Sequence, residues 1–93
     1  MVEQADHRDR LKHKVITDRR LTYQQRIVGW NMVELSTEDS YSLSADEFTD
    51  RTGIPRRSVQ RALPQLIHYG YLTLVSIDPN HNVRTYRING SVT

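Results

Sequence analysis

The chain has 93 residues and no cysteine, and its 13 Lys and Arg residues against 11 Asp and Glu residues give a formal net charge of +2. This length allows one small domain with a single core and excludes enzymes built on large sheets. The lack of cysteine excludes disulfides and thiolate zinc sites, and no apolar run approaches the roughly 20 residues of a membrane helix. The sequence therefore predicts a cytoplasmic protein with no membrane partner.

The first 20 residues are predicted to form a charged N-terminal arm, followed by a domain over residues 21–93. The arm holds six basic and four acidic side chains and few apolar ones, which is typical of a partly flexible segment. Its most ordered part is expected at residues 11–16. A basic arm of this kind adds salt-sensitive affinity for DNA in some proteins, and a plain disordered tail is the alternative.

A first helix is predicted from about Tyr23 to Leu35, because Thr22 and Gln25 have the spacing of a capping box. On a helical wheel one apolar face faces the core, and it consists of Leu21, Val28, Met32 and Leu35. A second apolar strip, formed by Tyr23, Ile27 and Trp30, points elsewhere. One partner layer cannot cover both faces, so this strip must meet the arm, a later hairpin or the second subunit of a homodimer.

A short strand is predicted at residues 41–43, followed by a short helix that Ser44 caps and Gly53 ends. A third helix then runs over about residues 55–69. Its apolar residues gather on one side and its long hydrogen-bond donors on the other, which indicates a half-buried helix. Pro64 falls within it and is expected on the exposed side, where it should bend the helix. Two strands over 71–77 and 83–88, joined by turn residues, predict a β-hairpin.

The stretch from Leu43 to Leu63, followed by Leu66 and the Gly70-Tyr71-Leu72 segment, resembles bacterial winged helix-turn-helix domains. The similar domains are those of GntR-type regulators and of phage and plasmid replication proteins. The resemblance implies a mainly α fold with a small β-hairpin, in which three helices are joined by a wing sheet of two or three strands. It also implies double-stranded DNA as the partner, with the third helix in the major groove.

The chemistry of DNA recognition predicts the same surface, because base edges in the major groove are bound best by forked donors near a helix N-terminus. Arg57 and Arg61 point outward on the wheel and are the predicted base contacts, flanked by Gln60 and Gln65. Phosphate contacts are assigned to Arg56 and Ser58, and wing contacts to His81 and Arg84. The predicted DNA-binding residues are thus Arg56, Arg57, Ser58, Gln60, Arg61, Gln65, His81 and Arg84.

The leading hypothesis is a sequence-specific DNA-binding protein of the nucleoid, which acts as a transcription regulator or as a replication-origin-binding protein. The alternative is a winged-helix module for protein interaction or dimerisation, since a charge of +2 is mild for a DNA-binding protein. No grouping of nucleophile, base and acid, no phosphate-binding loop and no metal-ligand spacing stands out, so neither an enzyme nor a cofactor is predicted.

Overall fold

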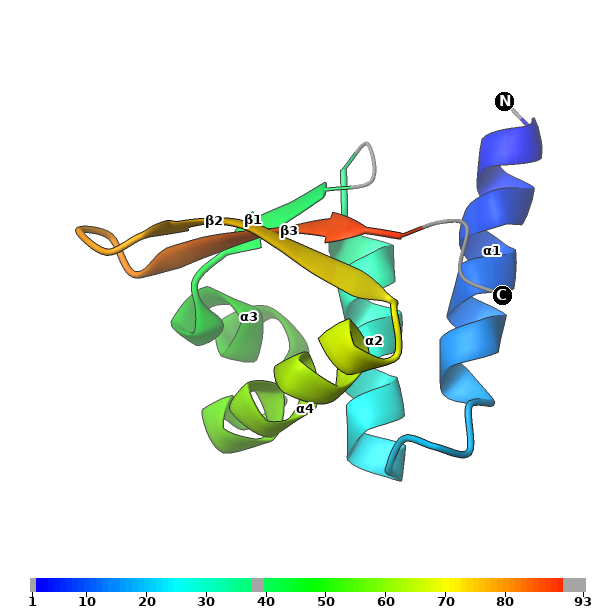
Figure 1. Cartoon of the computed structure of the whole chain (residues 1–93), viewed down its shortest axis with the longest axis horizontal. Helices are drawn as coiled ribbons and strands as arrows, with labels where there is room; N and C mark the ends of the chain where they lie inside the picture. The colour runs from blue at the N-terminus through cyan, green and yellow to red at the C-terminus, as the bar shows by residue number, and fades with distance from the viewer. Residues whose placement is uncertain (1, 38–39, 90–93) are drawn as a thin grey trace.

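A computed structural model describes residues 2–37 and 40–89 of the chain (Figure 1). Within these residues the protein is a small mixed α/β fold of four helices and a three-stranded antiparallel sheet. The last four residues of the predicted domain, 90–93, lie outside the described part. In chain order the elements are α1 (Val2–Ile16), α2 (Tyr23–Leu35), β1 (Ser40–Leu43), α3 (Ala45–Thr52), α4 (Arg56–His68), β2 (Leu72–Asp78) and β3 (Val83–Ile88).

The predicted helix starts are confirmed. At α2 the Thr22 hydroxyl accepts a hydrogen bond from the Gln25 backbone N–H at 3.2 Å, and the Gln25 side chain accepts one from the Thr22 N–H at 3.0 Å. At α3 the Ser44 hydroxyl accepts from the Glu47 N–H at 3.2 Å. These bonds satisfy N–H groups that have no partner inside the helix, and therefore fix where each helix begins.

Two glycines end helices α3 and α4. Gly53 follows α3 with a φ of +78°, and Gly70 follows α4 with a φ of +86°, a backbone region that other residues rarely adopt. The Gly70 N–H binds the Ile67 carbonyl and the Tyr71 N–H binds the Leu66 carbonyl, which is the Schellman pattern. The chain therefore leaves α4 sharply and enters β2.

The sheet has the strand order β1-β3-β2, so β3 is central and β2 lies at an open edge. Figure 1 shows α2, α3 and α4 on one side of this sheet, and the turn between β2 and β3 projecting past α3 and α4. Tyr86 and Ile88 of β3 are buried toward the helices, while Arg87 between them is exposed, as the alternation predicts. The register shifts between Leu74 and Ser76, so Val75 forms a bulge in β2.

Helices α1, α2 and α4 meet at Gly29 in the middle of α2. A Cβ at this position would lie 2.6 Å from Cγ2 of Val15 in α1 and 2.9 Å from a methyl carbon of Leu66 in α4. A side chain at residue 29 would occupy space that these two neighbours already fill. The packing of the three helices therefore depends on glycine at this position.

The N-terminal segment differs from the flexible arm that its charge predicts, because residues 2–16 form helix α1. Leu11 and Val15, four residues apart on one face, are buried in the core, and α1 packs along α2. Two well-placed apolar residues, together with the pairing of Lys12 to Glu34 at 2.6 Å, anchor a helix that is otherwise charged. The described fold thus has one helix more than the three that were predicted.

Candidate nucleic-acid interface

Helix α4 has two unlike faces. Val59, Ala62 and Leu66 are buried against the other helices, and this face anchors α4 in the core. The opposite face is exposed and bears long hydrogen-bond donors, as predicted. Its exposed members are Arg57, Gln60, Arg61, Gln65 and His68.

Arg57 and Arg61 are the central residues of this exposed face. Among the described residues neither has a hydrogen-bond or ion-pair partner, and both side chains are exposed. Two guanidinium groups four residues apart lie about one turn apart on the same side of a helix. The ten donor N–H groups of these two side chains are thus free to bind an external acceptor.

Arg56 and Ser58, predicted to bind phosphate, have partners within the chain. The Arg56 Nη1 lies 3.3 Å from Oδ1 of Asp46 in α3, and the Ser58 hydroxyl donates to the side-chain oxygen of Gln24 in α2 at 3.2 Å. The Arg56 pair is half exposed and therefore weak, so this side chain can exchange its partner. Ser58 is half-buried, and its bond ties the start of α4 to α2.

The hairpin turn has its own hydrogen bonds. The Asp78 carboxylate accepts from the Asn80 N–H at 3.0 Å and lies 2.9 Å from the His81 ring Nδ1, while Asn82 adopts a left-handed φ of +54°. These contacts give the turn a defined shape and occupy one ring nitrogen of His81. His81 itself is exposed at the projecting end of the hairpin.

Arg84 lies on the face of the sheet that faces the helices. It is two residues before Tyr86, and its register partner in β2 is Ile77. Among the residues that the structure describes, its guanidinium has no hydrogen-bond or ion-pair partner. The structure therefore brings Arg84 to the same side of the molecule as α4, whereas Arg87 lies on the other face of the sheet.

A groove of about 380 Å³ separates α4 from the sheet. Arg56 and Gln60 of α4 line it together with Arg84 of β3, so three of the predicted site residues meet around one hollow. Much of the remaining lining is apolar and comes from all the surrounding elements: Met32, Phe48, Val59, Leu63, Ile67 and Leu74. Sequence reasoning did not find this groove, because its walls come from segments that are far apart in the chain.

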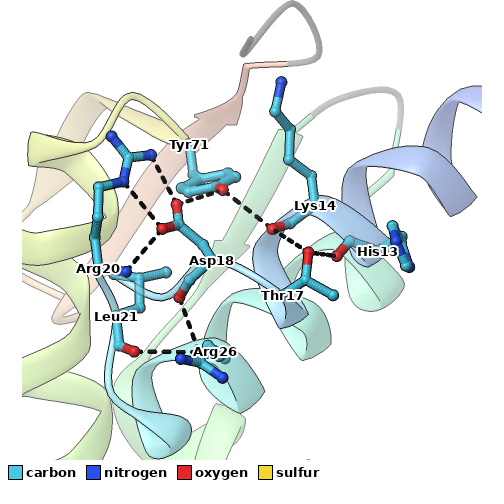
Figure 2. A network of polar contacts seen from close by, with 8 residues as sticks. All are labelled: His13, Lys14, Thr17, Asp18, Arg20, Leu21, Arg26 and Tyr71. Carbon is cyan, nitrogen blue, oxygen red and sulfur yellow. Dashed lines mark hydrogen bonds and ion pairs between the residues drawn. The ribbon is translucent and has the colours of Figure 1, made fainter.

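A second polar site, which the sequence does not reveal, fixes the corner between α1 and α2 (Figure 2). The Asp18 carboxylate accepts hydrogen bonds from the Arg20 guanidinium at 2.7 and 3.0 Å and from the Tyr71 hydroxyl at 2.7 Å. The Arg26 Nε donates to the carbonyl of Asp18 at 2.8 Å and to that of Leu21 at 3.1 Å. Tyr71 immediately precedes β2, so this network ties the α1–α2 corner to the base of the hairpin.

The charges of this corner shift the ionisation of its members. The hydrogen bond from Arg20, helped by the one from Tyr71, holds the pKa of Asp18 well below its usual range. Burial, together with the bond to Asp18, raises the pKa of Tyr71 to about 12. The network is therefore an ionised carboxylate held by neutral and cationic donors, and its role is structural.

The second apolar strip of α2 is largely used inside the chain. Trp30 is half-buried and Lys12 of α1 lies over its ring at 4.8 Å from the centroid, while Ile27 is also half-buried. Of the three residues predicted for a homodimer, only Tyr23 is strongly exposed, at 71%. Of the partners considered for this strip, the N-terminal segment is the one that covers Trp30.

Comparison of the chain with protein-family models, with curated proteins and with solved structures finds no match. None of the helices within residues 2–37 and 40–89 has both the length and the apolar character needed to cross a membrane. The same described residues contain no cluster of three or more His, Asp or Glu side chains that could hold a metal ion.

Proposed function

We propose that this protein is a winged helix-turn-helix protein that binds double-stranded DNA with sequence specificity. The order α2-β1-α3-α4-β2-β3 and the sheet order β1-β3-β2 support this fold. In the proposal α3 and α4 form the helix-turn-helix, α4 enters the major groove, and the β2–β3 hairpin is the wing. Helix α1 is then an addition that packs behind α2, and the protein acts in the cytoplasm on the nucleoid as a regulator or an origin-binding protein.

One observation carries the proposal: the exposed face of α4 bears forked and amide donors with no described protein partner, while its other face is buried. Arg57 and Arg61 have the geometry that binds guanine edges in the major groove, and Gln60 and Gln65 beside them suit adenine. Exposing these polar side chains to water costs little free energy. They contribute binding energy only when an external acceptor is present.

The phosphate contacts belong to residues around the groove. Among the described residues Arg84 has no hydrogen-bond or ion-pair partner, and it faces α4. The ion pair of Arg56 with Asp46 is exposed and therefore weak. His81, exposed at the turn, is the proposed contact to a neighbouring phosphate or to the minor groove. Ser58 contributes less than the sequence predicts, because its hydroxyl is bound to Gln24.

Selection of bound sequences from a random DNA pool at two salt concentrations tests the proposal. We expect one enriched sequence, and we expect Arg57→Ala or Arg61→Ala to weaken binding to it by about 1–3 kcal/mol and to relax its specificity. Arg87→Ala, which removes an exposed arginine from the opposite face of the sheet, is the matched control and should leave binding unchanged. The absence of enrichment and of any DNA complex at low salt would refute the proposal.

The competing function, a protein-interaction module, is favoured by the open edge of the sheet. Val75 and Ile77 of β2 are 52% and 54% exposed, and no charged residue interrupts the strand from Leu72 to Ile77. Such an edge is a template for another strand. Binding of a protein partner that survives Arg57→Ala and Arg61→Ala, without any DNA complex, would support this function instead.

A further inference from the structure

The groove between α4 and the hairpin has the size and lining of a small-molecule site. Its volume of about 380 Å³ falls within the roughly 300–1,000 Å³ of known ligand pockets. Leu63 and Ile67 of α4 and Leu74 of β2 form apolar walls, and both Ile67 and Leu74 remain more than a third exposed. The described part of the chain thus leaves an apolar hollow uncovered in the middle of its candidate interface.

The polar residues of the groove select the charge of its occupant. Arg84 and Asn82 line the end near the hairpin turn, and Arg84 has no hydrogen-bond or ion-pair partner among the described residues. Arg56, on the α4 side, forms an ion pair with the exposed carboxylate of Asp46. An unpaired guanidinium beside apolar walls attracts an anion and repels a cation.

The phosphate backbone of DNA matches only part of this groove. The phosphates of a sugar-phosphate chain can bind Arg84 and Arg56. The same chain offers no apolar surface to Leu63, Ile67 and Leu74, so these side chains would stay in contact with water or with charged groups and would add no binding energy. An occupant that uses both halves of the lining has an apolar body and one anionic end. A carboxylate suits a guanidinium because its two oxygens accept two parallel hydrogen bonds.

We propose that this groove binds a single-chain amphipathic carboxylate, of the class of medium-chain fatty acids, with its carboxylate on Arg84. The alkyl chain lies between α4 and β2 against Leu63, Ile67 and Leu74. This inference rests in part on the proposed function, because Arg84 is also a proposed DNA contact. A bound carboxylate then competes with DNA, and the wing and the recognition helix together form a sensor within the DNA-binding unit.

Titration of the ¹⁵N-labelled protein with decanoate, below its micelle concentration and without DNA, tests the site directly. We expect amide shifts at Leu63, Ile67 and Leu74, and an affinity about tenfold higher for decanoate than for decylammonium, which has the same chain and the opposite charge. Arg84→Gln should lower the decanoate affinity by about tenfold, while Arg87→Gln, on the opposite face of β3, should leave it unchanged. The inference would be overturned by equal affinities for decanoate and decylammonium, by an unchanged decanoate affinity in Arg84→Gln, or by amide shifts confined to other surfaces.

A second assay separates this inference from the proposed function. Decanoate added to the complex of the protein with its selected DNA should release the DNA, and decylammonium should not. If the protein binds DNA but decanoate causes no shifts in the groove, the ligand site is refuted and the DNA-binding function stands. If decanoate binds through Arg84 while no DNA sequence is bound, the ligand site stands and the DNA-binding function is refuted.

Discussion

The contact of three helices at Gly29 allows a quantitative test of the fold. An alanine Cβ here would lie 2.6 Å from Val15 Cγ2 and 2.9 Å from a Leu66 methyl, whereas ordinary contacts begin at 3.4 Å. Val15 and Leu66 are both fully buried in the close-packed core, so their methyl groups have little room to move aside. Overpacking of a core costs about 1–3 kcal/mol, and contact on two sides places Gly29→Ala at the upper end of that range.

The helix itself favours the substitution, since alanine is about 1 kcal/mol better than glycine inside a helix. The net expectation is a loss of about 2 kcal/mol in the free energy of unfolding. For a domain of this length the loss corresponds to a fall in Tm of roughly 10 °C. Thermal and urea unfolding followed by circular dichroism and by Trp30 fluorescence measure it.

A double-mutant cycle isolates the cause of this loss. Val15→Ala removes the methyl that lies 2.6 Å from the new Cβ, so Gly29→Ala should cost clearly less in the Val15→Ala background than in the native chain. If Gly29→Ala instead raises Tm, as helix propensity alone predicts, or if the two substitutions are additive, then α1 and α2 do not pack at Gly29 as described.

Three further predictions concern stability. Asp18→Asn should lower the free energy of unfolding at pH 7 by about 2 kcal/mol, because it removes the charged acceptor of the Arg20 and Tyr71 bonds. Because the pKa of Asp18 is lower in the folded than in the unfolded chain, its contribution is complete above about pH 4 and is lost as the pH falls further, so native and variant stabilities measured by urea unfolding should converge in acid. Tyr41→Phe should leave the free energy of unfolding unchanged or raise it, since the Tyr41 hydroxyl is buried with no partner among the described residues; a fall of more than about 1 kcal/mol would show that the hydroxyl is bonded. Pro64→Ala should stabilise the protein by about 2 kcal/mol, because proline inside α4 removes a hydrogen bond, and an unchanged urea midpoint would contradict this reasoning.

Local sequence signals predicted most of the element boundaries. A hydroxyl residue three positions before a glutamine or glutamate located the starts of α2 and α3, and Gly53 and Gly70 located the ends of α3 and α4. Such signals succeed because a helix cap depends on hydrogen bonds between residues a few positions apart, and a helix end depends on a glycine that can adopt the left-handed conformation. The burial of one face of α4 followed from its periodicity in the same way.

What the sequence did not predict depends on contacts between distant segments. Asp18 and Tyr71 are 53 residues apart, so no spacing rule indicates that they share a hydrogen bond. Among the residues of α1 whose burial is described, 8–16, Leu11 and Val15 are the buried ones, and the helix packs closely on α2 because Gly29 has no side chain there. The many charges and few apolar residues predicted an arm with an ordered part at residues 11–16, because so few apolar residues give no strong periodic signal for a longer helix.

The distribution of charge explains how a chain with a net charge of only +2 can present the basic interface proposed above. On the side of α1 and α2, Lys12 pairs with Glu34 and Arg20 pairs with Asp18. On the exposed face of α4, Arg57 and Arg61 have no such partners among the described residues. The molecule extends over 37 × 28 × 23 Å, whereas electrostatic fields decay over about 10 Å at 0.1 M salt. A polyanion that approaches α4 therefore responds mainly to the charges near this helix: Arg57 and Arg61, which have no described partner, and the exposed carboxylates of α3, such as Asp46, which oppose them.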